Sequence, residues 1–191
     1  MKPLGMNTAL LLIDVQKGLD NPALGERNNP AAESNIAALL AQWRVAQKPI
    51  IHIRHDSSDP DSLLRPELPG NAFKPEALPL SGEKIIAKSV NSAFVGTELE
   101  QYLQQQDISS LVIVGLTTDH CVSSSTRMAA NLGFDVTLVS DATAAFERLG
   151  YDGKRYSGDE IHRINLVSLQ DEFCDLCSSA ELLNSRFPAT P

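Results

Sequence analysis

Short apolar segments alternate with amphipathic ones along almost the whole chain. Six of the apolar segments are rich in β-branched residues, as is typical of strands that are buried on both faces. They are Thr8–Val15, Pro49–Arg54, Lys84–Ala87, Leu111–Leu116, Phe134–Val139 and a last one near Phe173–Cys177. All are far shorter than the roughly twenty apolar residues that a membrane-spanning helix needs.

Helical periodicity fills the intervals between these segments. Asn29 and Pro30 form an N-cap and a first-turn proline, and one apolar stripe follows them: Ile36, Leu39, Leu40 and Trp43. Further helices are expected from a Thr97–Glu100 capping box, over about Asp119–Asn131, from a Ser157–Glu160 capping box to Leu169, and over Ser179–Asn184. The alternation predicts an α/β fold, a three-layer sandwich in which a six-stranded, mostly parallel sheet carries helices on both faces.

The stretch 55–82 breaks this rhythm. It has prolines at positions 60, 66, 69, 75 and 79. A connection this long inside a compact domain is usually a lid or a binding loop, although a surface excursion or a subunit-contact arm also fits. A second irregular stretch, 147–158, could flank a pocket as well. Without repeats or low-complexity tracts, the chain is expected to form one domain over 1–191, with 55–82 as a Pro-rich excursion.

Composition narrows the class of protein. Apolar residues make up 42% of the chain and charged residues 21%, as in folded soluble domains. The net charge of −8, with no basic cluster, argues against binding to nucleic acid or to an anionic membrane. Three cysteines are too few for a disulfide framework, and the N-terminus shows no signal-peptide pattern, so a cytoplasmic location is expected.

Three reactive side chains are expected at one edge of the sheet. Asp14 ends the first strand, Lys88 follows the third, and Cys121 lies at the start of the helix after the fourth. Ligands of parallel sheets bind beyond the carboxyl ends of the strands. The helix start favours a thiolate at Cys121, whereas Asp14 opposes it, so the thiol could stay protonated until a base acts. Taken singly, these residues have plainer interpretations: a loop cap, a surface lysine and a buried structural cysteine.

A resemblance to a known family rests on four stretches: LLLIDVQ (Leu10–Gln16), KSVNSAF (Lys88–Phe94), GLTTDHCVSSSTRMAANLGFDV (Gly115–Val136) and VSDATAAF (Val139–Phe146). In this order, over most of the chain, the sequence resembles the isochorismatase-like cysteine hydrolases. That family includes nicotinamidases, N-carbamoylsarcosine amidases and ureidoacrylate amidohydrolases. The resemblance implies a Rossmann-like sheet of six strands, in agreement with the pattern above.

The same resemblance implies a catalytic triad of Asp14, Lys88 and Cys121 that works without a cofactor. It also implies a cis peptide bond between Leu116 and Thr117, which would turn the N–H of Thr117 toward the same point as that of Cys121. Two convergent donors would form an oxyanion hole. The leading hypothesis is a hydrolase that cleaves a C–N bond of an amide, carbamoyl or ureido compound through a thioester. The alternatives are a vinyl ether hydrolase on the same scaffold, a non-catalytic binding protein and a thiol-based redox protein.

After the second strand the chain departs from the metal-dependent nicotinamidases. Their Asp-x-His pattern aligns with His55 and Ser57, and no histidine follows in the loop 56–82, so a His-rich metal site is not expected. His55 is expected on a pocket wall instead, with Gln16 and Phe94 as further substrate-binding residues because each lies shortly after a triad residue. The expected partner is a small molecule, and the resemblance implies a homo-oligomer, either a dimer or a tetramer.

Overall fold

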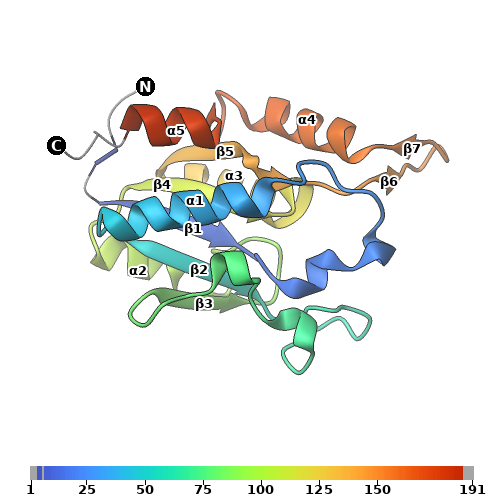
Figure 1. Ribbon diagram of the computed structural model, residues 1–191, viewed down its shortest axis with the longest axis horizontal. Helices are drawn as coiled ribbons and strands as arrows, with labels where there is room; N and C mark the ends of the chain where they lie inside the picture. Colours follow the sequence, from blue (N-terminus) through green and yellow to red (C-terminus); the bar gives the residue numbers. More distant parts are fainter. Residues whose placement is uncertain (1–3, 6, 187–191) are drawn as a thin grey trace.

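A computed structural model describes residues 4–5 and 7–186 (Figure 1). Its main sheet has six strands, which pair in the order β3-β2-β1-β4-β5-β8. Every pairing between them is parallel, so the predicted α/β fold is confirmed. The strands are β1 (Thr8–Ile13), β2 (Ile50–His55), β3 (Lys84–Lys88), β4 (Ser110–Leu116), β5 (Asp135–Ala144) and β8 (Asp175–Cys177).

Five helices cover the sheet: α1 (Ala32–Val45), α2 (Leu99–Gln105), α3 (Ser123–Asn131), α4 (Gly158–Leu169) and α5 (Ser179–Arg186). The side chains of β1 alternate between the two faces, as the period of two along a strand requires. Leu10 and Leu12 pack with α1 and α5, and the predicted stripe of α1 belongs to this cluster. Leu11 and Ile13 pack with α2, α3 and α4 on the other face. Figure 1 shows α1 in front of the sheet. None of the helices that the structure describes is long and apolar enough to cross a membrane.

Two elements differ from the sequence prediction. β5 continues to Ala144 instead of ending at Val139, with a register shift against β4. The stretch 147–158 contains a short antiparallel hairpin, β6 (Arg148–Leu149) and β7 (Arg155–Tyr156). Strands of this length leave no periodic pattern in a sequence, which is why the hairpin was not predicted.

Of the two predicted capping boxes, one is present. At the start of α4 the Ser157 hydroxyl accepts a hydrogen bond from the N–H of Glu160, and the Glu160 carboxylate accepts one from the N–H of Ser157. The box predicted from Thr97 and Glu100 is wrong. The N-cap of α2 is Glu98, and the Thr97 hydroxyl donates back to the carbonyl of Ala93.

The Pro-rich excursion 55–82 packs onto the rest of the fold. It contains two short 3-10 turns, Pro69–Asn71 and Pro75–Ala77, and Ala77 itself belongs to the core. Phe73 forms an isolated antiparallel bridge with Gln16, just beyond the end of β1. The excursion is thereby attached to the edge of the sheet where the candidate catalytic residues lie.

Candidate active site

Neighbouring strand ends bring the candidate residues together. Asp14 follows β1 directly, while His55 and Lys88 are the last residues of β2 and β3 and pair with each other in the sheet register. Cys121 lies beyond β4, in a π-helical turn over Thr118–Val122 that leads into α3. Because the sheet order is β3-β2-β1-β4, the four side chains come from four successive strands at the carboxyl edge of the sheet.

The ammonium group of Lys88 is the centre of this cluster. Its Nζ lies 2.7 Å from Oδ2 of Asp14, 2.7 Å from Nδ1 of His55 and 3.2 Å from Sγ of Cys121. It also donates to the carbonyl of Val90 at 3.1 Å. The side chains of Lys88 and Asp14 are 0% and 1% exposed. Among the described residues, the Lys88 ammonium is the one close cationic partner of the buried Asp14 carboxylate.

Burial sets the protonation states of the cluster. It raises the pKa of Asp14 above its usual value, although Lys88 opposes the shift. Burial and the charge of Asp14 raise the pKa of Cys121 to about 12, and burial and the charge of Lys88 lower the pKa of His55 to about 4. At neutral pH the thiol is therefore protonated and the imidazole is neutral. The thiol needs a base, and a carboxylate with a raised pKa is a stronger base than an ordinary aspartate.

The end of β4, which leads into the turn that carries Cys121, lies close against β1. The peptide bond between Leu116 and Thr117 is cis, as the resemblance implied. Just before it, Gly115 has φ +123°, and a Cβ at this position would lie 2.1 Å from the carbonyl oxygen of Ile13. Only glycine allows both this backbone conformation and this close approach. Gly115 thus lets the end of β4 reach the strand that places Asp14.

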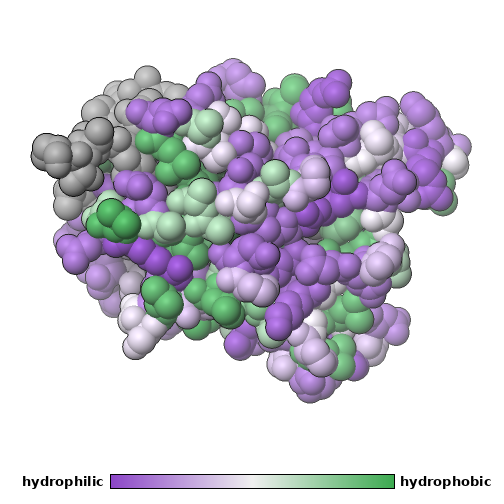
Figure 2. Space-filling view, in the orientation of Figure 1, coloured by the Kyte–Doolittle hydropathy of each residue, from purple (hydrophilic) through white to green (hydrophobic). Residues whose placement is uncertain are grey.

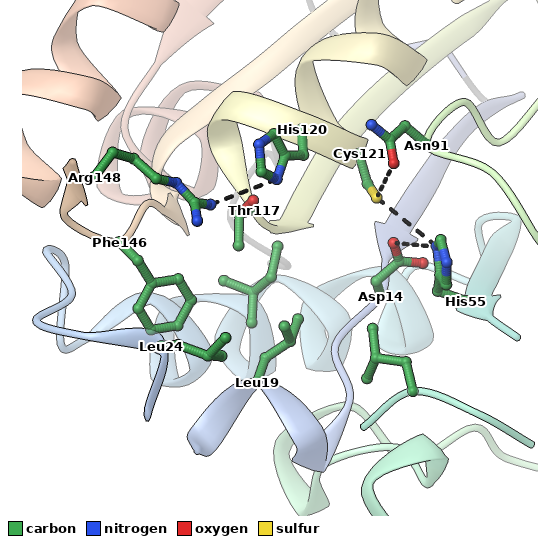
Figure 3. Close-up of a pocket in the computed structure, with 12 residues that line it drawn as sticks. Asp14, Leu19, Leu24, His55, Asn91, Thr117, His120, Cys121, Phe146 and Arg148 are labelled. Atoms are coloured by element: carbon green, nitrogen blue, oxygen red, sulfur yellow. Dashed lines mark hydrogen bonds and ion pairs between the residues drawn. The ribbon is translucent and has the colours of Figure 1, made fainter. Parts of the chain in front are cut away.

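A cavity of about 200 Å³ opens at the cluster. Figure 3 shows Asp14, His55, Asn91 and Cys121 on one side of it and Arg148 on the opposite side. Apolar side chains form much of the remaining wall: Leu19, Leu24, Leu64, Leu116 and Phe146. Figure 2 shows hydrophobic side chains on the right of this face, in the region of the 55–82 excursion and the segment before α1. The space fits a small molecule, below the usual size of drug-binding pockets.

Comparison with known proteins places this site in a family. The model of the isochorismatase domain matches residues 8–181. The chain belongs to the isochorismatase family. It is 47% identical to the uncharacterised isochorismatase family protein YrdC of Bacillus subtilis, over 92% of this chain and 94% of that protein. A solved isochorismatase-family structure from Chromobacterium violaceum has a TM-score of 0.93 and 45% identity, over 97% of both chains. The maleamate amidohydrolase of Pseudomonas putida is 25% identical, over 94% of this chain and 86% of that enzyme.

Two family residues that were expected to bind substrate lie away from the cavity wall. Gln16 is fully buried, and its amide bonds the backbone of His55 and the carbonyl of Asn71. Phe94 packs against the core, with its ring 5.9 Å from that of Phe134. His55, by contrast, lines the cavity and contacts Lys88.

Other cavity residues were missed by sequence reasoning. Arg148 lies in the stretch that the sequence marks only as a pocket flank, and Asp119 holds it through Oδ2, 3.1 Å from Nη2. Asn91 lies inside the family motif after β3, which was a usable signal; its Oδ1 is 3.9 Å from the sulfur of Cys121. Leu19 lies in a short 3-10 turn after β1 that neither a motif nor a periodic pattern marks.

The cluster also bears on metal binding in this family member. Asp14, His55 and Cys121 form the one group of described residues whose potential ligand atoms gather, within 4.8 Å of one another. The Lys88 ammonium already contacts all three, and its positive charge would repel a metal ion at the same place. The ligand atoms of these three side chains therefore suit the Lys88 ammonium group better than a metal ion.

Proposed function

We propose that this isochorismatase-family protein is a cysteine-dependent hydrolase that cleaves the C–N bond of a small amide, carbamoyl or ureido compound through a thioester. One observation carries the proposal: a buried lysine contacts both a buried carboxylate and a cysteine sulfur beside a small cavity. The likeness to an enzyme named as an amidohydrolase supports the same chemistry.

The first half-reaction forms the thioester. Asp14 accepts the proton of the Cys121 thiol, and the Lys88 ammonium stabilises the thiolate. The sulfur attacks the substrate carbonyl carbon, and the carbonyl π electrons move to the oxygen. The backbone N–H groups of Thr117 and Cys121 stabilise this oxyanion. As the C–N bond breaks, Asp14 gives its proton to the leaving nitrogen, which departs as ammonia or an amine.

The second half-reaction hydrolyses the thioester. Asp14 takes a proton from a water molecule, and the water oxygen attacks the thioester carbonyl. When the tetrahedral intermediate collapses, the C–S bond breaks and the acid product leaves. The proton then passes from Asp14 to the sulfur, so both groups return to their starting states.

Release of ammonia or amine from a panel of small amides, carbamoyl compounds and ureido compounds tests this proposal. We expect release from at least one of these classes. Cys121→Ser should lower the rate by at least about 10³-fold, because the nucleophile is lost. The matched control is Cys174→Ala, since Cys174 is also a buried free cysteine but does not line the cavity. It should keep the rate within about threefold.

Trapping of the intermediate makes the test specific for covalent catalysis. An acyl adduct on the Cys121 peptide, detected by mass spectrometry, would identify the thioester. No release from any compound by the folded protein, or an undiminished rate in Cys121→Ser, would contradict the proposal. Hydrolysis of isochorismate, a vinyl ether, would then be measured next.

A further inference from the structure

His55 is the side chain of the cluster to which the proposed mechanism gives no role. It ends β2, which lies between the strand that places Asp14 and the strand that carries Lys88. Its Nδ1 is 4.0 Å from the sulfur of Cys121 but only 2.7 Å from Nζ of Lys88. The close partner of His55 is therefore the lysine and not the nucleophile.

This short contact defines the state of the imidazole. An ammonium group has three donors and no acceptor, so Nδ1 accepts the hydrogen bond and the ring proton lies on Nε2. The titratable groups that face the ring are Asp14, Lys88 and Cys121, with Asp56 nearby. The pKa of His55, lowered to about 4 by burial and by Lys88, agrees with a ring that stays neutral.

Lys88 has more close neighbours than hydrogens. Its three N–H bonds face Asp14 and His55 at 2.7 Å, the carbonyl of Val90 at 3.1 Å and the sulfur of Cys121 at 3.2 Å. The two shortest contacts fix the direction of the ammonium group. Without the acceptor on His55, the ammonium group would be free to turn or to move away from the sulfur.

The backbone of His55 is also fixed by hydrogen bonds. The fully buried amide of Gln16 accepts from the N–H of His55 at 2.8 Å and donates to its carbonyl at 3.1 Å. The amide of Asn71 donates to the same carbonyl at 3.0 Å. Two amide side chains thus fix one backbone position, which is the kind of support that a precisely placed site residue needs.

We propose that His55 is a positioning residue: as a neutral acceptor, it holds the Lys88 ammonium where that group stabilises the Cys121 thiolate. The inference rests on the proposed function, because the thiolate is the nucleophile of that reaction. It can nevertheless be tested without a substrate, through the rate at which iodoacetamide alkylates Cys121.

Three substitutions of His55 test the roles of its two ring nitrogens separately. His55→Leu removes both, His55→Asn keeps an acceptor near the place of Nδ1, and His55→Gln keeps a polar group near the place of Nε2. Alkylation of the Cys121 peptide at neutral pH should slow by at least about tenfold in His55→Leu and His55→Gln, as expected for one lost hydrogen bond to a charged group. His55→Asn should recover the rate to within about threefold of wild type.

A double-variant cycle tests whether His55 acts through Lys88. In a Lys88→Met background, His55→Leu should slow alkylation by less than about twofold more, because the group that it positions is absent. Alkylation of folded His55→Leu at the wild-type rate or faster would overturn the inference, and so would a full effect in the Lys88→Met background.

Protein folding and turnover are controlled separately in this design. Thermal unfolding shows which variants are folded, and if His55→Leu does not fold, equal alkylation of His55→Asn and His55→Gln would overturn the inference by itself. None of these measurements needs turnover. An amide panel without product would therefore contradict the proposed function and leave the alkylation result to decide the role of His55.

Discussion

Two lysines are almost completely buried among the described residues, and they pair with carboxylates in different surroundings. Lys88 is 3% exposed and Lys74 is 2% exposed. Lys88 pairs with Asp14, for which it is the one close cationic partner in the described part of the chain. Lys74 pairs with Glu33, which also receives two parallel hydrogen bonds from the guanidinium of Arg27, at 2.6 and 2.7 Å.

The charged donors around the two carboxylates shift their pKa values in opposite directions. Burial opposes the ionisation of both. At Glu33, the hydrogen bonds from Arg27 and Lys74 outweigh burial, and the pKa is lowered to about 2. At Asp14, the Lys88 ammonium and the weaker donor Cys121 do not outweigh burial, and the pKa is raised. Glu33 is thus a weak base that ties the 55–82 excursion to α1, whereas Asp14 is suited to take a proton.

Replacing both Asp14 and Lys88 tests the contrast between the two buried pairs, and we expect it to have the largest effect, which is on turnover. Asp14→Asn/Lys88→Met should lower turnover of a substrate by at least about 10³-fold, because both the base and the cation are lost. The free energy of unfolding should stay unchanged or rise by up to about 2 kcal/mol, since a buried ion pair with few hydrogen bonds does not offset its own desolvation. Initial rates and urea unfolding measure the two quantities. A loss of more than about 2 kcal/mol would mean that this pair holds the fold together.

Replacing both Glu33 and Lys74 should lower the stability of the fold and leave turnover nearly unchanged. Glu33→Gln/Lys74→Met leaves Arg27, which is 18% exposed, without its carboxylate partner and removes one of the ties between the excursion and α1. The hydrogen bond from Arg44 of α1 to the carbonyl of Leu78 remains. We expect the free energy of unfolding to fall by about 2–4 kcal/mol. The kcat should stay within about threefold of wild type, while KM rises because the excursion supplies Leu64 to the cavity wall. A hundredfold loss of kcat at unchanged stability would reverse the roles assigned to the two pairs.

The sequence predicts the sheet and the meeting of the triad, but not the difference between these two pairs. Asp14, Lys88 and Cys121 lie at or just beyond the carboxyl ends of three parallel strands of one sheet, so topology brings them to the same edge. Lys74 lies in a segment without periodicity, and its partner Glu33 is distant in sequence. Which carboxylate faces one cationic side chain and which faces two depends on packing between these segments, and no local pattern specifies it.

Gln16 shows a second limit of sequence reasoning. Its position two residues after Asp14 suggested a place in the pocket. The backbone at Asp14 is left-handed, with φ +49°, so the alternation of β1 does not continue through it. The side chain of Gln16 therefore reaches the backbone of His55 at the end of β2. A single left-handed residue of this kind is set by the tertiary fold, which is why the spacing alone misplaced the side chain.

The smallest expected effect is on stability in acid. Lowering the pH should change the contributions of Glu33 and Asp14 to the free energy of unfolding in opposite directions. Because the pKa of Glu33 is lowered from 4.5 to about 2, its contribution to stability is present above pH 4.5 and is lost as the pH falls toward 2. The pKa of Asp14 is raised, so its ionisation costs stability as the pH rises above 3.8. Urea unfolding at about pH 5.5 and about pH 3 should show the gap between wild type and Glu33→Gln narrowing by about 1–2 kcal/mol at the lower pH. The free energy of unfolding of wild type, compared with that of Asp14→Asn, should instead rise as the pH is lowered from about 5.5 to about 3. If lowering the pH changed the free energy of unfolding in the same direction in both comparisons, the pKa values of Glu33 and Asp14 would not be shifted in opposite directions.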